Sequence, residues 1–194
     1  MEGKKLVLIL FISSLLFAFT AEGHGSQTFA GAPTSTKTVP IPGDCKKICD
    51  HTKYPKLCLR TITPYLIWGK TDAASVLHME LKATEKMVEK SLKSTKSVLK
   101  SAAIDQCVSM YDNTLYRIQQ AVDALKAGDV GTLNAMLSAI GTNIRTCENG
   151  FSEVGEASHH VLSTFDLKIH RLSENCLAIS KLLPKAQNME QREN

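Results

Sequence analysis

The sequence predicts an all-α protein, an antiparallel up-down four-helix bundle that is preceded by an N-terminal helical hairpin and stapled by disulfides. Two observations predict this fold. Four long segments carry apolar residues at steps of three and four, which gives each helix one apolar face, whereas no segment alternates as a strand would. Six cysteines follow a start that is typical of a secretory signal peptide, and secreted chains usually pair their cysteines.

The first 23 residues have the pattern of a signal peptide. Lys4 and Lys5 precede an apolar run over residues 6–19, which is too short to span a bilayer comfortably. Small residues follow at Ala21 and Gly23, as signal peptidase requires. We therefore expect cleavage after Gly23 and a secreted mature protein with no membrane association.

Composition divides the mature chain. A stretch rich in Gly, Ser, Thr and Pro comes first, and Pro55 and Pro64 then limit the next segment to short helical pieces that fold back on one another. The expected division is a flexible arm over 24–43, a folded domain over 44–186 with a hairpin over 44–68 and a bundle over 71–184, and a polar tail over 187–194.

The bundle helices are punctuated by local signals. Gly128 supplies a left-handed stop after the second helix, Asp129 can cap the third, and Pro184 closes the fourth. The third helix should end near Gly150, where a loop over 150–158 begins. We expect the four helices over residues 71–100, 103–127, 130–150 and 162–183.

Two disulfides follow from spacing. If the second and third helices form a hairpin that turns near Gly128, Cys107 lies 21 residues before the turn and Cys147 lies 19 after it. The mismatch along the helix axis is about 3 Å, which a disulfide can absorb. Cys49 and Cys58 bracket a short stretch, and a bond between them would close the N-terminal hairpin.

Two cysteines remain. Cys176 occupies a seam position of the fourth helix and is expected to be a buried free thiol, which leaves Cys45 without a partner. A third disulfide between Cys45 and Cys176 is the alternative, if the N-terminal hairpin lies across the bundle.

Charge and site chemistry exclude several classes of function. The net charge is +4, and basic and acidic residues interleave along the helices, which argues against a nucleic-acid partner. The sequence has no nucleophile beside a base and no paired carboxylates, so we expect no catalytic residues and no cofactor. His159 and His160 are adjacent and would diverge on a helix, so no metal site is expected.

The chain resembles the plant invertase and pectin methylesterase inhibitor family over nearly all of the mature domain. The resemblance implies the same hairpin, four-helix bundle and two disulfides. The segments that carry it are Cys49-Asp50-His51-Thr52-Lys53-Tyr54-Pro55-Lys56-Leu57-Cys58, Asp105-Gln106-Cys107 with Tyr111, Gly128-Asp129, Leu137-Ser138-Ala139, Thr146-Cys147-Glu148-Asn149-Gly150-Phe151 and Leu177-Ala178-Ile179-Ser180-Lys181-Leu182-Leu183.

The resemblance implies an extracellular protein of the plant cell wall that inhibits one of two enzymes, pectin methylesterase or acid invertase. Inhibition would occur through a reversible one-to-one complex over the substrate cleft of the enzyme. Invertase inhibitors of the family often carry Pro-Lys-Phe just after the Gly-Asp, where this chain has Val130-Gly131-Thr132. That difference favours pectin methylesterase as the partner of a monomeric inhibitor. The alternatives are an inhibitor of cell-wall or vacuolar acid invertase and a non-inhibitory helical binding scaffold.

The expected docking surface lies on the second and third bundle helices. Esterase inhibitors tend to carry acidic side chains at the positions of Ser109, Asn113 and Tyr116, none of which is acidic here. A polar surface with an aromatic and an arginine anchor could still bind the partner. Its candidate residues are Tyr116, Gln119, Thr142, Arg145, Thr146 and Asn149.

Overall fold

A computed structural model describes residues 41–66, 69–97, 100–154 and 159–184, with the backbone alone for 152–154 and 159–161. The expected signal peptide, almost all of the flexible arm and the polar tail lie outside these residues. None of the helices in the described part of the chain is both long enough and apolar enough to cross a membrane.

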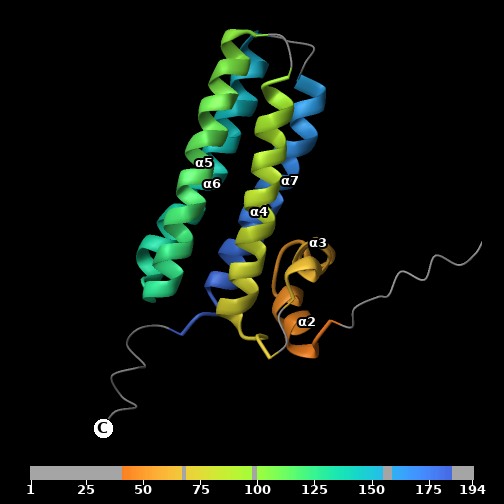
Figure 1. The fold of residues 1–194 in the computed structure, drawn as a ribbon, viewed down its shortest axis with the longest axis vertical. Coiled ribbons are helices and arrows are strands. Elements are labelled where there is room, and N and C mark those ends of the chain that lie inside the picture. Colours follow the sequence, from red (N-terminus) through yellow and green to blue (C-terminus); the bar gives the residue numbers. More distant parts are fainter. Residues whose placement is uncertain (1–40, 67–68, 98–99, 155–158, 185–194) are drawn as a thin grey trace, which may run out of the picture. The chain divides into compact units, whose positions relative to one another are not determined.

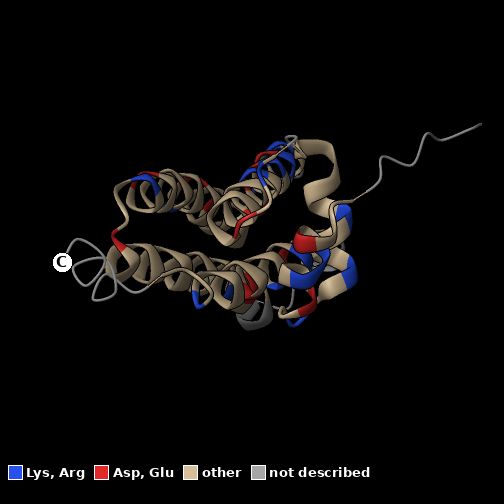
Figure 2. Cartoon of the chain, turned by 90° about the horizontal axis from the view of Figure 1, so that it is seen from below, with Lys and Arg blue, Asp and Glu red and all other residues tan. Residues whose placement is uncertain are grey.

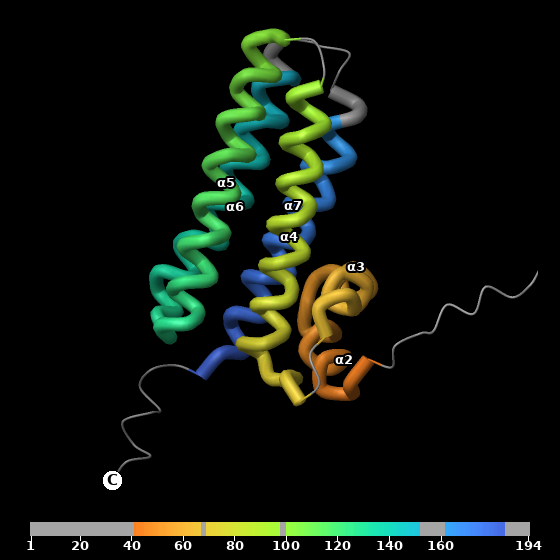
Figure 3. Tube along the Cα trace, in the orientation of Figure 1, coloured from red at the N-terminus to blue at the C-terminus, as the bar shows by residue number. Residues whose placement is uncertain are grey.

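Four long helices form the bundle, and all the described regular structure is helical (Figure 1). Neighbouring pairs in the packing are α4 with α5, α5 with α6, α6 with α7, and α7 with α4. The chain runs up α4, down α5, up α6 and down α7 (Figure 3), which confirms the antiparallel up-down bundle. The helix bounds are α4 Ala73–Thr95, α5 Ala102–Ala127, α6 Val130–Val154 and α7 His159–Ser180.

The N-terminal hairpin consists of α2 (Gly43–Asp50), α3 (Pro55–Ile62) and the 3₁₀ turn η1 (Thr63–Tyr65). The Cys49–Cys58 disulfide joins the two helices, with Cα atoms 5.6 Å apart. The hairpin packs against α4 and α7. Pro55 stands in the first turn of α3, where a missing N–H is tolerated, so this proline starts a helix instead of breaking one.

The predicted apolar faces make the core. Leu77, Leu81, Ile118, Leu137, Ile144 and Ile169 are each at most 1% exposed. Ten polar or charged side chains in the described part of the chain are buried, and each requires hydrogen-bond partners because an unpaired polar group is costly there. Among them, Asp166 on α7 accepts from Tyr111 on α5, and Asn175 on α7 donates to Glu80 on α4 and to the Tyr54 carbonyl of the N-terminal hairpin.

Several expected helix bounds are wrong, among them those of the fourth bundle helix, which spans His159–Ser180 instead of 162–183. The third bundle helix continues past Gly150 to Val154, because Gly150 is buried against the Gln106 side chain and serves close packing instead of a stop. The first bundle helix begins at Ala73 behind the Asp72 cap, whose Oδ1 accepts from the Ser75 N–H at 2.8 Å, and ends at Thr95 instead of Lys100. At that end the Ser97 hydroxyl donates to the Ser94 carbonyl, a local bond that competes with helix continuation.

The third disulfide weighed from the sequence is absent, since Cys45 and Cys176 are buried free thiols. Cys176 lies beside Thr84 of α4, whereas the carboxylates that influence Cys45 are its neighbour Asp44 on α2 and Asp72, the N-cap of α4. Thr84 and Asp72 are three turns apart, about 18 Å along the axis, so the two thiols meet different parts of α4. Burial raises the pKa of both thiols.

Candidate partner interface

The α5–α6 hairpin is built by local signals at its turn. Gly128 has a φ of 72°, in the left-handed region, and its N–H donates to the Leu125 carbonyl at 3.2 Å. The next N–H, of Asp129, donates to the Ala124 carbonyl at 2.9 Å, which completes a Schellman motif. The Asp129 carboxylate then accepts from the Thr132 N–H at 2.9 Å and caps α6, so the two helices are joined by a minimal turn.

The opposite end of the hairpin is closed covalently. The Cys107–Cys147 disulfide joins α5 to α6 with Cα atoms 4.6 Å apart, the pair expected from the spacing around Gly128. Because the turn and the disulfide hold both ends, the two helices cannot slide past each other. The register of the hairpin surface is therefore set.

A buried hydrogen bond supports this surface from behind. The Tyr111 hydroxyl on α5 donates to the Asp166 carboxylate on α7 at 2.6 Å, and both residues are at most 1% exposed. Burial is the largest cause that raises the pKa of Asp166, to about 7, and burial also raises the pKa of Tyr111. Whether Asp166 is neutral or charged, this hydrogen bond connects α5 to α7 and stiffens the bundle beneath the α5–α6 hairpin.

The expected docking residues are mostly at the surface. Tyr116 is 60% exposed, the most exposed of the large hydrophobic side chains in the described part of the chain. Gln119, Thr142, Arg145 and Asn149 are exposed, and Thr146 is half-buried.

Tyr116 is the centre of a cluster whose other members the sequence reasoning missed. The Arg117 guanidinium lies 5.6 Å from the centroid of the Tyr116 ring and donates to Gln120 Oε1 at 2.9 Å. Gln120 in turn donates to the Tyr116 hydroxyl at 3.3 Å. Arg117 also contacts the sulfur of Met136 on α6 at 3.9 Å, so the cluster bridges both helices. The i, i+1, i+4 spacing of Tyr, Arg and Gln is its sequence signal.

The α6 candidates form a second, separate row. The Thr142 hydroxyl donates to the Ser138 carbonyl at 3.2 Å and the Thr146 hydroxyl to the Thr142 carbonyl at 3.0 Å. Their hydrogens are therefore used within the helix, and both hydroxyls face a partner as acceptors. Thr146 precedes the disulfide residue Cys147, whereas Tyr116 lies nine residues beyond Cys107, about 13 Å along the axis.

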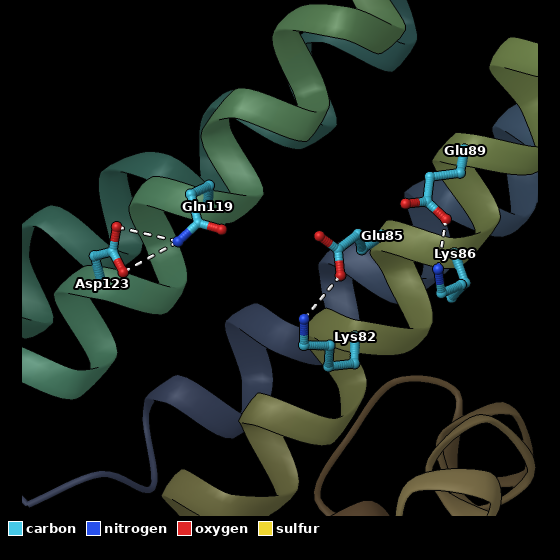
Figure 4. Close-up of polar contacts among 6 residues, drawn as sticks. All are labelled: Lys82, Glu85, Lys86, Glu89, Gln119 and Asp123. Carbon is cyan, nitrogen blue, oxygen red and sulfur yellow. Dashed lines mark hydrogen bonds and ion pairs between the residues drawn. The ribbon is translucent and has the colours of Figure 1, made fainter.

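Gln119 does not belong with either group. Its amide nitrogen donates to both carboxylate oxygens of Asp123, at 3.1 and 3.2 Å. Figure 4 shows this pair on α5, in view together with the ion pairs of Lys82 and Lys86 on α4. Gln119 is thus hydrogen-bonded within its own helix and takes no part in the Tyr116 cluster.

Metal chemistry has no visible basis in the described residues, where no three His, Cys, Asp or Glu side chains are grouped so as to hold an ion. The side chains of His159 and His160 lie outside that description. What the α5–α6 hairpin offers instead is a rigid surface with the cluster of Tyr116 and Arg117.

Comparison with protein families gives the origin of this architecture. The family described as plant invertase/pectin methylesterase inhibitor matches residues 44–179. This chain belongs to that family. The match begins within α2 and ends one residue before the end of α7, so it includes the hairpin and the whole bundle.

Relatives within and around the inhibitor family fall into two groups. A "Pectinesterase inhibitor" of Actinidia deliciosa is 26% identical over 71% of this chain and 78% of that protein, and "Pectinesterase inhibitor 6" of Arabidopsis thaliana is 24% identical over 71% and 74%. "Pectinesterase 1" of Citrus sinensis is 29% identical over 70% of this chain but only 27% of that protein. The chain thus spans about a quarter of the length of the curated pectinesterases that it matches.

A solved structure of the inhibitor family shows the same fold. The crystal structure of a mutant form of a pectin methylesterase inhibitor from Arabidopsis superimposes with a TM-score of 0.61 at 22% identity, over 74% of this chain and 99% of that one. The relatives that the chain covers over most of their length are named as pectinesterase inhibitors, whereas the pectinesterases are matched over about a quarter of theirs.

Proposed function

We propose that this protein is a non-catalytic inhibitor of pectin methylesterase that binds reversibly, one to one, over the substrate cleft of the enzyme. The observation that carries this proposal is the match over the entire hairpin and bundle to an inhibitor family, together with high coverage of two pectinesterase inhibitors. Inhibition then requires only a rigid surface that excludes the polymer from the cleft.

The start of α6 supports pectin methylesterase over invertase. Invertase inhibitors that resemble this chain insert a Pro-Lys-Phe peptide from this position. Here Val130 is the first residue of α6, and the N–H of Thr132 is held by the Asp129 cap. The equivalent residues are therefore part of a helical turn and do not project as an insertion peptide.

The α5–α6 surface supports binding to a large partner. The disulfide and the Gly128 turn fix the helices, so little conformational freedom is lost when a partner docks. Tyr116 and Arg117 are residue types that are enriched among binding hot spots, and both lie at the hairpin surface. We propose that this cluster, together with Thr142, Arg145, Thr146 and Asn149, forms the interface.

The test is inhibition by the oxidised protein of two purified enzymes. Pectin methylesterase is followed by release of methanol from esterified pectin, and acid invertase by release of hexose from sucrose. The expected result is loss of esterase activity with unchanged invertase activity, and co-elution of inhibitor and esterase on gel filtration at one-to-one stoichiometry. Inhibition of invertase alone would contradict the proposal, and a lack of complex with either enzyme would favour a helical scaffold.

We further propose that the protein acts outside the cell, in the plant cell wall, as a monomer that lacks residues 1–23. The support is the signal-peptide pattern, the two disulfides, which require an oxidising compartment, and the nature of the proposed target. N-terminal sequencing of the protein recovered from cell-wall fluid should begin at His24. A sequence that begins at Met1 would contradict the assignment.

A further inference from the structure

A groove of about 590 Å³ lies between the N-terminal hairpin and α7. Its lining residues belong to other elements than those of the Tyr116 cluster. Five of its ten lining residues are basic and none is acidic. Figure 2 colours the ribbon of the hairpin, on the right of the view, blue at several Lys and Arg positions, with acidic positions in red among them. The volume is in the range of small-molecule sites, and a concave surface lined by one sign of charge concentrates the electric field.

The groove is held open by polar bonds between segments 121 residues apart. The side-chain amide of Asn175 on α7 accepts from the Tyr54 N–H at 3.0 Å and donates to the Tyr54 carbonyl at 3.2 Å. Beside it, the Lys53 ammonium forms an ion pair with Glu174 at 2.7 Å. The Cys49–Cys58 disulfide stiffens the hairpin wall. The two walls therefore have a defined separation before any ligand binds.

The cations form two short rows. On α3, Lys56 and Arg60 are four residues apart, and on α7, Lys168 and Arg171 are three apart, so each row repeats at about 5–6 Å. In the described part of the chain, Lys53 is the one basic lining residue that is paired with a carboxylate. Burial, Arg60 and Lys90 lower the pKa of Lys168, the sign expected where cations crowd without a counter-ion.

Apolar surface lies between the rows. Leu167 on α7 is 46% exposed, although it sits on an amphipathic helix, and Pro55 and Leu57 border it from α3. The Tyr54 ring at one side of the groove has the Arg171 guanidinium 5.3 Å and the Lys53 ammonium 5.5 Å from its centroid. Cations flanking an apolar floor suit a ligand that carries regular anionic groups on a ring with C–H faces.

We propose that this groove binds an acidic oligosaccharide with one carboxylate per sugar ring, of the kind that pectin methylesterase leaves when it hydrolyses the methyl esters of pectin. The rows of Lys56 with Arg60 and of Lys168 with Arg171 would bind successive carboxylates, and the rings would pack on Leu167 and Pro55. The choice of saccharide rests on the proposed function, whereas the charge and shape of the groove do not. Such a site would hold the inhibitor on wall regions that the enzyme has already de-esterified.

The test is calorimetric titration of the oxidised protein with a fully de-esterified oligogalacturonate and with the fully methyl-esterified oligomer of equal length. We expect binding of the first alone, weakened by added salt because exposed charges are screened. The groove variant carries Lys56→Gln, Arg60→Gln and Lys168→Gln. The control carries Lys82→Gln, Lys86→Gln and Lys126→Gln, which also remove three positive charges, here from ion pairs at the surface of α4 and α5. Figure 4 shows the pairs of Lys82 and Lys86.

The groove variant should bind the de-esterified oligomer at least about tenfold more weakly than the native protein, and the control within about twofold. Equal losses in both variants would overturn the proposal, because net charge alone would then explain binding. So would equal affinity for poly-glutamate, which would assign the groove to acidic peptides, or no binding by the native protein. Folding of each variant is checked by its melting temperature, and Lys56→Gln alone, at an exposed position, is the fallback if the triple variant unfolds.

Inhibition of pectin methylesterase separates this proposal from the proposed function. The groove variant should inhibit the enzyme on soluble esterified pectin as the native protein does. Oligogalacturonate binding without any inhibition by the native protein would contradict the proposed function and leave the groove site standing. Inhibition without oligogalacturonate binding would do the reverse.

Discussion

Asn175 of α7 donates a hydrogen bond to the carboxyl group of Glu80 on α4, with 3.2 Å between Nδ2 and Oε1, and both side chains are fully buried. The same Asn175 amide holds both backbone groups of Tyr54. The other Glu80 oxygen lies 2.7 Å from the Thr61 hydroxyl on α3. One buried carboxyl and one amide therefore connect the hairpin to two helices of the bundle.

The hydrogen bonds of this junction can accommodate a neutral Glu80. Thr61 has one hydroxyl hydrogen and lies within hydrogen-bond distance of two acceptors besides Glu80, the Leu57 carbonyl at 2.8 Å and the Cys58 carbonyl at 3.0 Å. If the hydroxyl donates to a carbonyl, the contact with Glu80 requires the carboxyl to be the donor. In agreement, burial raises the pKa of Glu80 to about 7, against the opposing hydrogen bonds of Thr61 and Asn175.

The first prediction is that stability falls as pH rises towards and through 7. The folded pKa values of Glu80 and Asp166 lie above their unfolded values, so the folded state binds more protons between about pH 4 and 7. The stabilisation is complete below the unfolded pKa and is lost as pH rises through the folded one. Urea unfolding should show a free energy lower at pH 8 than at pH 5 by on the order of 3 kcal/mol.

The second prediction assigns part of that slope to Glu80. Glu80→Gln keeps an acceptor for Asn175 and a donor for Thr61 but cannot ionise. The variant should therefore be about 1–3 kcal/mol more stable than the native protein at pH 8 and nearly equal to it at pH 5. The matched control is Glu89→Gln, at an exposed position in an ion pair with Lys86, which should leave the pH dependence unchanged. An unaltered slope in Glu80→Gln would contradict the assignment.

The third prediction concerns the buried hydrogen bond that supports the α5–α6 hairpin. Tyr111→Phe removes the hydroxyl that donates to Asp166 and leaves a buried carboxyl without that partner. We expect a loss of about 1–3 kcal/mol in the free energy of unfolding, larger at pH 8 than at pH 5 because the charged carboxylate needs the donor more. Denaturant titration of Tyr111→Phe, Asp166→Asn and the double variant would measure the coupling, and additive effects would show that the two residues do not interact.

The fourth prediction compares the two disulfides. Cys107 and Cys147 are separated by 40 residues, and Cys49 and Cys58 by 9. In the chain-entropy model the longer loop contributes about 4 kcal/mol and the shorter about 2.7, so replacing the first pair by alanine should cost about 1 kcal/mol more than replacing the second. Thermal melts of the two double variants decide it. A larger cost for the short loop would show that native packing of the hairpin dominates.

The fifth prediction tests the docking surface. Tyr116→Ala and Arg117→Ala should each weaken inhibition of pectin methylesterase by about 2 kcal/mol, roughly thirtyfold, while the fold persists because both side chains lie at the surface. Leu182→Ala, at a 38% exposed hydrophobic on the far end of the chain, is the control and should leave the inhibition constant unchanged. Full inhibition by both Tyr116→Ala and Arg117→Ala would show that this cluster is not part of the interface.

The sequence by itself determined the helices, their antiparallel order and the two covalent pairs. Each follows from rules that act over short distances: the three- and four-residue period, the left-handed Gly128, and the nearly equal distances of Cys107 and Cys147 from that turn. Family membership could be inferred for the same reason, because its motifs surround these local features.

Only the tertiary structure decided which polar residues matter. Gly150 has the residue type of a helix stop, yet packing against Gln106 makes it an interior position. Glu80 lies on a helix like any surface glutamate, and its burial depends on a hairpin that docks from outside the bundle. At the basic groove, Lys53 is bonded to Glu174, which lies 121 residues later in the chain. No local period encodes this proximity, because it arises from the packing of separate elements.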